Sequence, residues 1–88
     1  MIVFGKDNCE FCDKAKGLLE EVTIPYIYVD IGWNSALKQG LLDYLDSIGT
    51  PHTVPQVFGD EGHIGGYDKL AWYLQHKGCF EGCFEEIV

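Results

Sequence analysis

Residues 2–12 read Ile-Val-Phe-Gly-Lys-Asp-Asn-Cys-Glu-Phe-Cys: an apolar run, a short polar loop and two cysteines three positions apart. The apolar run predicts a buried strand, and the spacing of the apolar residues after the loop predicts a helix that starts at Cys9. These apolar residues are Ala15, Leu18, Leu19 and Val22. At a helix N-terminus, free backbone N–H groups and the helix dipole stabilise a thiolate, which makes Cys9 a candidate nucleophile. Cys12 would then wait one helical turn away, so the stretch indicates thiol–disulfide exchange.

The rest of the chain continues this alternation of strands and helices. Strand, helix and strand in succession predict a βαβ unit whose strands are parallel. The expected elements are a strand over 1–5, a helix over 9–22, a strand over 26–29, a helix from Asn34 or Ser35 to Gly49, strands over 54–58 and 63–64, and a helix opening at Asp68. The residues expected to face the core from the second and third helices are Leu37, Leu41, Leu45, Ile48, Leu70, Tyr73 and Leu74.

Length and composition predict one small domain, because the chain has 88 residues of which 47% are hydrophobic. We expect the domain over 1–76 and an extension over 77–88 that packs on it. The extension could form a short C-terminal helix, whose apolar face would be Phe80, Cys83, Phe84 and Ile87. The net charge of −8 argues against a nucleic-acid partner, and no apolar stretch reaches membrane-spanning length.

The four cysteines allow structural disulfides, a zinc site or redox chemistry. A CxxC next to a βαβ pattern, with no signal peptide at the N-terminus, favours redox chemistry in the cytoplasm. A zinc site would need Cys79 and Cys83 as further ligands, and the gap between those two is wider than the usual spacing. Cys79 and Cys83 could form a second redox pair, but the apolar neighbours of Cys83 favour a packed thiol. We therefore expect no metal.

Two further motifs follow the CxxC. Thr53-Val54-Pro55 comes just before a predicted strand, and Gly65-Gly66-Tyr67-Asp68 opens the third helix; residues 53–70 together read TVPQVFGDEGHIGGYDKL. With these three motifs in this order, the chain resembles the glutaredoxin family, most of all the small dithiol glutaredoxins of bacteria and phages. The resemblance extends from Met1 to about Gln75. It implies an α/β, thioredoxin-like fold, β-α-β-α-β-β-α, with a four-stranded mixed sheet flanked by helices.

The resemblance also implies an activity and a site. The activity is that of a glutathione-dependent oxidoreductase, which reduces protein disulfides or glutathione mixed disulfides, with ribonucleotide reductase as the leading protein client of a monomeric enzyme. Cys9 would attack and Cys12 would resolve the mixed disulfide. The residues implied to bind glutathione are Lys6, Phe11, Thr53, Val54, Pro55, Gly66, Tyr67 and Asp68. The Val54–Pro55 bond is implied to be cis, presenting the backbone of Val54 to an extended ligand.

Several of these residues have simpler explanations that stay open. Pro55 could be an ordinary proline that opens an edge strand, Lys6 a solvated side chain, and Asp68 a helix cap. His63 is expected at the surface of its strand. The position next to the helix N-terminus predicts that Cys9 is the more exposed cysteine, and such a position can lower a thiol pKa from about 8.5 to roughly 3.5–7.5.

The sequence departs from the commonest dithiol motif, which has Pro and Tyr between the cysteines where this chain has Glu10 and Phe11. Glutaredoxins without that proline can hold a [2Fe–2S] cluster between two copies with glutathione as ligand, which is one alternative. Leu42 stands where many relatives have a polar or basic residue for glutathione. That replacement favours a second alternative, a redoxin that takes its electrons from thioredoxin reductase.

Overall fold

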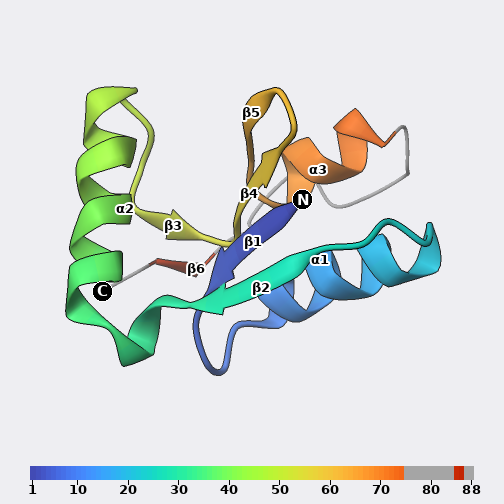
Figure 1. Cartoon of the computed structure of the whole chain (residues 1–88), viewed down its shortest axis with the longest axis horizontal. Coiled ribbons are helices and arrows are strands. Elements are labelled where there is room, and N and C mark those ends of the chain that lie inside the picture. Colours follow the sequence, from blue (N-terminus) through green and yellow to red (C-terminus); the bar gives the residue numbers. More distant parts are fainter. Residues whose placement is uncertain (75–84, 87–88) are drawn as a thin grey trace.

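The computed structural model describes residues 1–74 and 85–86 (Figure 1). The elements occur in the order predicted from the sequence, with one additional short helix and one additional strand pairing. They are β1 (Ile2–Gly5), α1 (Glu10–Glu21), β2 (Ile27–Asp30), the 3-10 helix η1 (Ile31–Trp33), α2 (Ser35–Ser47), β3 (Thr53–Val54), β4 (Gln56–Gly59), β5 (Gly62–Gly65), α3 (Tyr67–Tyr73) and β6 (Glu85–Glu86). Neither η1 nor β6 was expected. The fold is the predicted thioredoxin-like α/β fold.

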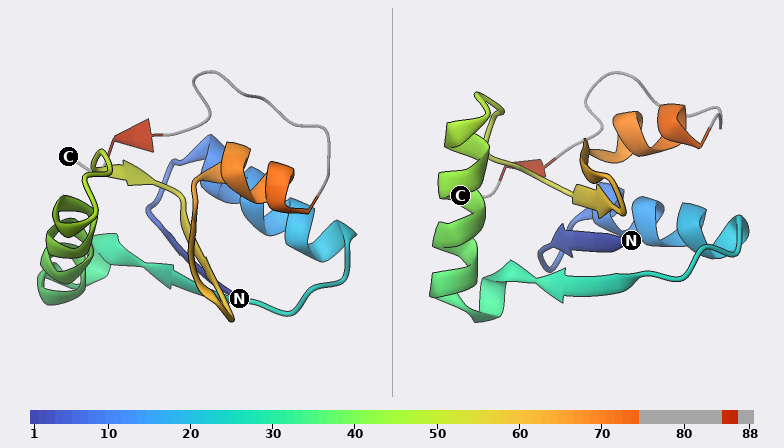
Figure 2. Two further views of the ribbon diagram at one scale, coloured as in Figure 1. Left: turned by 90° about the horizontal axis from the view of Figure 1, so that it is seen from above. Right: turned by 45° about the horizontal axis from the view of Figure 1, so that its top comes forward.

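The central sheet has four strands in the order β2-β1-β4-β5. β1 is parallel to β2, as the βαβ pattern predicted, and antiparallel to β4. β4 and β5 form an antiparallel hairpin. Helices α1 and α3 lie together on one face of this mixed sheet and α2 lies on the other, as the two views in Figure 2 show. Because β1 and β2 run in parallel, the loop that carries Cys9 and the turn into η1 both start at the carboxyl end of these two strands.

The two faces of the sheet contribute to two hydrophobic clusters, because successive residues of a strand point to opposite sides. Val3 of β1 and Val57 of β4 pack with α1 and α3, and both side chains are fully buried. Their neighbours Phe4 and Phe58 pack on the opposite face. That second cluster also contains both cysteines of the CxxC. The redox pair is therefore built into the core between the sheet and α2.

Helices α2 and α3 bury only part of their predicted apolar faces. In α2 the middle residues Leu41 and Leu45 are buried, whereas Leu37 and Ile48, at or just past the helix ends, are 43% and 44% exposed. α2 therefore contacts the core through its middle turns.

The assignment of Tyr73 to the core is wrong, since its side chain is 52% exposed. The buried residues of α3 are Leu70 and the unpredicted Ala71, and Leu74 packs against the same cluster. Residues spaced i, i+1 and i+4 share one face of a helix, and Tyr73 falls at its margin.

The strand predicted over 54–58 is divided by Pro55. Thr53–Val54 form β3 outside the central sheet, and the strand resumes as β4 at Gln56. The partner of β3 is β6 from the C-terminal extension, so the two described residues of that extension form a strand and not a helix. The apolar residues predicted for that helix, together with Cys79, lie outside the described residues. No described helix has the length and apolar character needed to cross a membrane.

Candidate active site

The CxxC forms the first turn of α1. Cys9 is the N-cap residue, and its sulfur accepts a hydrogen bond from the backbone N–H of Cys12 at 3.1 Å. The backbone N–H of Asp13 donates to the carbonyl of Cys9, also at 3.1 Å. The sulfur atoms of Cys9 and Cys12 are joined in a disulfide, and the two Cα atoms are 5.2 Å apart. The Cys12 N–H at the start of α1 would stabilise a thiolate on Cys9 after reduction, as the position of Cys9 at a helix N-terminus predicted.

Cys9 is more deeply buried than its position at the helix N-terminus suggested. Cys9 is the more exposed of the two, as predicted, but only 2% of its surface is accessible, and Cys12 has none. The disulfide folds both sulfur atoms into the cluster on the α2 side of the sheet. The other buried members of this cluster are Ile31, Leu41, Leu45 and Val54. Little of Cys9 is therefore accessible to a reacting sulfur in this disulfide form.

Gly5 and Tyr28 form the wall beneath the disulfide. A Cβ added at Gly5 would lie 2.9 Å from the Cys12 sulfur and would also collide with the Tyr28 hydroxyl, so only glycine fits there. That hydroxyl donates to the Lys6 carbonyl at 3.4 Å, and the Lys16 ammonium lies 4.0 Å from the centre of the Tyr28 ring. Burial, assisted by nearby carboxylates, raises the pKa of Tyr28 to about 12, so its hydroxyl keeps its proton at neutral pH.

Glu10, which replaces the proline of the common motif, is directed along the helix surface. Its carboxylate lies 3.7 Å from the Lys14 ammonium, and the side chains are 70% and 48% exposed. Lys14 also lies over the ring of Phe11, 4.7 Å from its centre. The Phe11 ring contacts that of Tyr67 on α3, with 5.9 Å between centroids. Two residues predicted to bind glutathione, Phe11 and Tyr67, are thus in contact.

The second part of the site is the turn at Pro55. The Val54–Pro55 peptide bond is cis, which confirms the prediction. Gln56, only 1% exposed, braces this turn through its side-chain amide. Its Nε2 donates to the Thr53 carbonyl at 2.9 Å and to the Thr53 hydroxyl at 3.1 Å. The hydroxyl of Thr53 accepts from Gln56 and keeps its own proton for a second partner.

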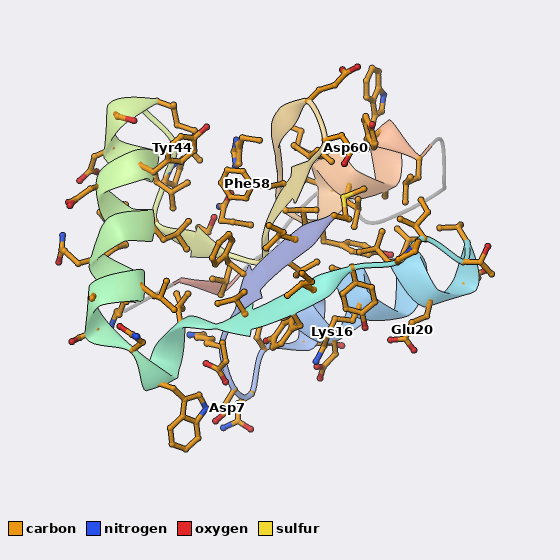
Figure 3. The ribbon with its side chains drawn as sticks, viewed as in Figure 1. Asp7, Lys16, Glu20, Tyr44, Phe58 and Asp60 are labelled. Atoms are coloured by element: carbon orange, nitrogen blue, oxygen red, sulfur yellow. A yellow bond between two sulfur atoms is a disulfide. The ribbon has the colours of Figure 1, made fainter. Side chains whose placement is uncertain are left out.

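His63 holds Gln56 from the other side. The Gln56 side-chain nitrogen donates to the Thr53 carbonyl, which can only accept, and this fixes the orientation of the amide. The Gln56 Oε1 atom therefore faces His63 and accepts a hydrogen bond from the imidazole Nε2 at 2.7 Å. The imidazole packs on Phe58 and Tyr44, with centroids 5.0 and 5.8 Å away; Figure 3 shows Tyr44 of α2 and Phe58 of β4 turned toward each other. Burial lowers the pKa of His63. The sequence interpretation of His63 as a surface residue missed this role, which the polar–apolar alternation of the strand does not reveal.

A groove of about 380 Å³ lies between the Pro55 turn and the start of α3. It brings together Thr53, Gly66 and Asp68, three of the residues predicted for glutathione. Its full lining is Thr50, Pro51, Thr53, Gln56, His63, Ile64, Gly65, Gly66, Asp68 and Lys69. A Cβ on Gly66 would lie 3.4 Å from an Asp68 carboxylate oxygen, so this carboxylate lies beside the bare backbone.

Asp68 does not cap α3. The N-cap residue is Gly66, without a side-chain hydrogen bond, which leaves the Asp68 carboxylate directed at the groove. Lys6 does not line the groove; it lies in the loop between β1 and α1. A second hollow, of about 520 Å³, lies along β5 and α3 and is lined in part by Trp72 and Tyr73. Within residues 1–74 and 85–86, no three His, Cys, Asp or Glu side chains are grouped to hold a metal ion.

Comparison with known proteins agrees with this geometry. The glutaredoxin family model matches residues 1–64. The chain belongs to the glutaredoxin family. It is 40% identical over 82 residues to glutaredoxin 1 of Escherichia coli K12, an alignment that covers 85% of this chain and 93% of that protein. It is also 39% identical over 72 residues to a glutaredoxin of Haemophilus influenzae, which covers 75% and 79% of the two chains.

The fold comparison points the same way. The solved structure of reduced E. coli glutaredoxin superimposes with a TM-score of 0.66 at 36% identity, over 84% of this chain and 91% of that one. Members of the family with two active-site cysteines are dithiol–disulfide oxidoreductases, and Cys9 and Cys12 form such a pair here. This glutaredoxin is therefore an enzyme of thiol–disulfide exchange.

Proposed function

We propose that this glutaredoxin uses glutathione to reduce protein disulfides or the mixed disulfides of proteins with glutathione. The observation that supports this best is the groove that joins Thr53, Gly66 and Asp68. Val54, next to Thr53, packs in the same cluster as the Cys9–Cys12 disulfide. A small extended thiol in the groove could thus direct its sulfur to Cys9.

The groove residues match the chemical groups of glutathione. The Asp68 carboxylate would accept from its ammonium group, and the backbone N–H groups near Tyr67 and Asp68 would hold the adjacent carboxylate. The Thr53 hydroxyl has a proton to donate, and the backbone of Val54 before Pro55 can pair with the cysteinyl unit as an added strand would. The rings of Phe11 and Tyr67 would form an apolar floor. At the other end, Lys6 would attract the glycyl carboxylate.

The reaction we propose runs through Cys9. Its thiolate attacks the glutathione sulfur of a mixed disulfide, the old S–S bond breaks, and the client leaves as a thiolate that takes a proton from solvent. Glutathione is now bonded to Cys9. The thiolate of a second glutathione attacks the sulfur of the glutathione bound to Cys9. The bond to Cys9 breaks, oxidised glutathione leaves, and the Cys9 thiolate is restored. With a protein disulfide, Cys12 attacks the mixed disulfide instead, and two glutathione molecules then reduce Cys9–Cys12.

A glutathione-coupled mixed-disulfide assay tests this function. We expect Cys9→Ser to remove turnover, whereas Cys12→Ser keeps it, because Cys9 alone completes the route through glutathione. Asp68→Asn should raise KM for the glutathionylated substrate about tenfold or more, since it removes a charge-assisted hydrogen bond. The matched control is Asp60→Asn, an exposed acid on the β4–β5 turn. Unchanged turnover in Cys9→Ser would contradict the proposal.

Ribonucleotide reductase is the protein client we propose, with the cytoplasm as the compartment and a monomer as the working form. All three follow from the family resemblance and from the need of a dithiol enzyme for a reducing thiol pool. Reconstituted ribonucleotide reduction, driven either by glutathione or by thioredoxin reductase, tests the client and the electron source together. Support requires deoxyribonucleotide formation with glutathione; formation with thioredoxin reductase alone would favour the alternative electron source.

A further inference from the structure

The edge of β3 already carries a strand from the same chain. β6 runs antiparallel to β3, with Glu86 opposite Thr53 and Glu85 opposite Val54. β3 is not part of the four-stranded sheet, and among the described residues β6 is the only strand that pairs with it. Figure 2 shows β6 alongside β3 in both views. The C-terminal extension therefore reaches the turn that precedes the cis proline.

This is the edge at which the proposed function places an extended ligand. Successive residues of a strand turn their N–H and C=O groups to opposite edges. The Thr53 carbonyl is turned to Gln56, at 2.9 Å from Nε2. The backbone groups of Val54 are therefore the ones directed to the other side, where an antiparallel neighbour can pair with them. A ligand that pairs with Val54 needs the same groups, and each N–H donates to one main-chain partner at a time.

Access to the Cys9 sulfur is restricted as well. Cys9 must be reached by the sulfur of a client or of glutathione, yet its exposed fraction is 2%. Val54, the residue opposite Glu85, lies in the buried cluster with Cys9 and Cys12. The strand β3, which pairs with β6, therefore contributes Val54 to the cluster that buries the disulfide.

We propose that β6 is a built-in competitor for the edge of β3, so that Glu85–Glu86 must unpair before glutathione or an extended client segment pairs with Val54. The inference rests on the proposed glutathione-dependent function. β6 resembles such ligands in two respects, because it is an extended main chain and its two residues are acidic. Glutathione also carries two carboxylates.

Competition of this kind has a defined kinetic signature. Only the fraction of molecules with β6 unpaired binds substrate, so the apparent KM equals the intrinsic KM divided by that fraction, while kcat at saturation is unchanged. A pairing of two residues is short, and we expect it to raise KM by about threefold to tenfold. Removing the strand should lower KM by that factor. A structural support for the fold would instead change kcat and stability.

The experiment compares four forms of the full enzyme on a glutathionylated peptide. Glu85→Pro with Glu86→Pro keeps the length but removes both N–H groups, and a chain that ends at residue 84 removes the strand altogether. Glu85→Gln with Glu86→Gln keeps the main chain and removes only charge. We expect KM to fall about threefold to tenfold in the proline and shortened forms and less in the glutamine form, with kcat unchanged in all.

Each other result is decisive. KM values equal to that of the parent in both the proline and the shortened forms overturn the competition and leave the proposed function intact. A KM that falls as far in the glutamine form overturns main-chain pairing as the cause. Absence of turnover on the glutathionylated peptide in every form, the parent included, overturns the proposed function itself. Should the proline form fail to fold, the shortened chain carries the comparison.

Discussion

Two turns form the site, and they are held in different ways. The covalent and hydrogen-bonded contacts of the Cys9–Cys12 turn join residues three or four positions apart: the disulfide, the bond from the Cys12 N–H to the Cys9 sulfur and the bond from the Asp13 N–H to the Cys9 carbonyl. Its packing is shared, because both cysteines lie in the same buried cluster as Val54. The Thr53–Pro55 turn depends on partners from elsewhere. These are His63, acting through Gln56, and β6.

The difference separates chemistry from recognition. The first turn sets the reactivity of a sulfur, which requires a helix N-terminus and little else. The second turn has to present a backbone edge and a hydroxyl to a ligand, and a two-residue strand outside the central sheet cannot hold itself in place. It is held by the hydrogen bonds of Gln56 and of His63 on β5. Substitutions of these two residues can alter ligand binding without changing the cysteines.

The largest expected effect is on stability, and it tests how far the Cys9–Cys12 turn depends on the packing of Gly5 against it. Gly5→Ala puts a Cβ 2.9 Å from the Cys12 sulfur and against the Tyr28 hydroxyl, in a fully packed site. We expect a loss of about 2–3 kcal/mol in the free energy of unfolding, from overpacking. Gly17→Ala is the matched control, because its Cβ meets nothing within 4 Å and a helical Gly→Ala stabilises by up to about 1 kcal/mol. Urea denaturation of the oxidised forms measures both; equal stability of Gly5→Ala and the parent would contradict the packing argument.

The next largest effect is expected when the Gln56 side chain, which holds the Thr53–Pro55 turn, is replaced. Gln56→Leu keeps the size of a buried side chain but leaves the Thr53 carbonyl and the His63 Nε2 without the amide that bridges them. We expect a loss of about 1–2 kcal/mol in stability and a higher KM for the glutathionylated substrate, with kcat little changed. Gln39→Leu is the control, since Gln39 is exposed on α2, where its Nε2 donates to the Asp43 carboxylate at 2.9 Å. Its stability should stay within about 0.5 kcal/mol of the parent. An unaltered KM in Gln56→Leu would show that Thr53 needs no brace.

A smaller effect follows from the pKa of His63. Burial lowers that pKa below its ordinary value of 6.5. As the pH falls through 6.5, His63 therefore binds a proton in the unfolded chain before it does so in the folded chain, and the free energy of unfolding decreases. The parent should lose more stability than His63→Gln between pH 7.5 and pH 5.5, as measured by urea denaturation at each pH. The comparison at pH 7.5, where the imidazole is neutral in both states, removes the pH-independent cost of the substitution. An equal slope in both proteins would mean that His63 titrates as it does in water.

The same contrast explains what the sequence could predict. Cys9 at the start of a helix and the parallel pairing of the first two strands follow from local spacing, and the structure confirms both. Residues whose role depends on distant partners were missed. His63 gives no local sign that it will hold Gln56, and nothing near Glu85 indicates a strand, because its partner lies some thirty residues earlier. The cis bond before Pro55 was predicted, but only through family resemblance.

The smallest effect concerns Glu10, the residue that distinguishes this CxxC from the common motif. Its carboxylate is 70% exposed and lies 3.7 Å from Lys14, so water and a cation both screen it from Cys9. Glu10→Gln should lower the pKa of the Cys9 thiol slightly and speed its alkylation at pH 6 by less than about threefold. Mass spectrometry of the reduced protein separates Cys9 from the other thiols, and Asp60→Asn serves as an exposed control. An acceleration of tenfold or more would mean that a neighbouring charge, and not the helix N-terminus, governs the reactive sulfur. The cysteine turn would then depend on its intervening residues, as the Thr53–Pro55 turn depends on its braces.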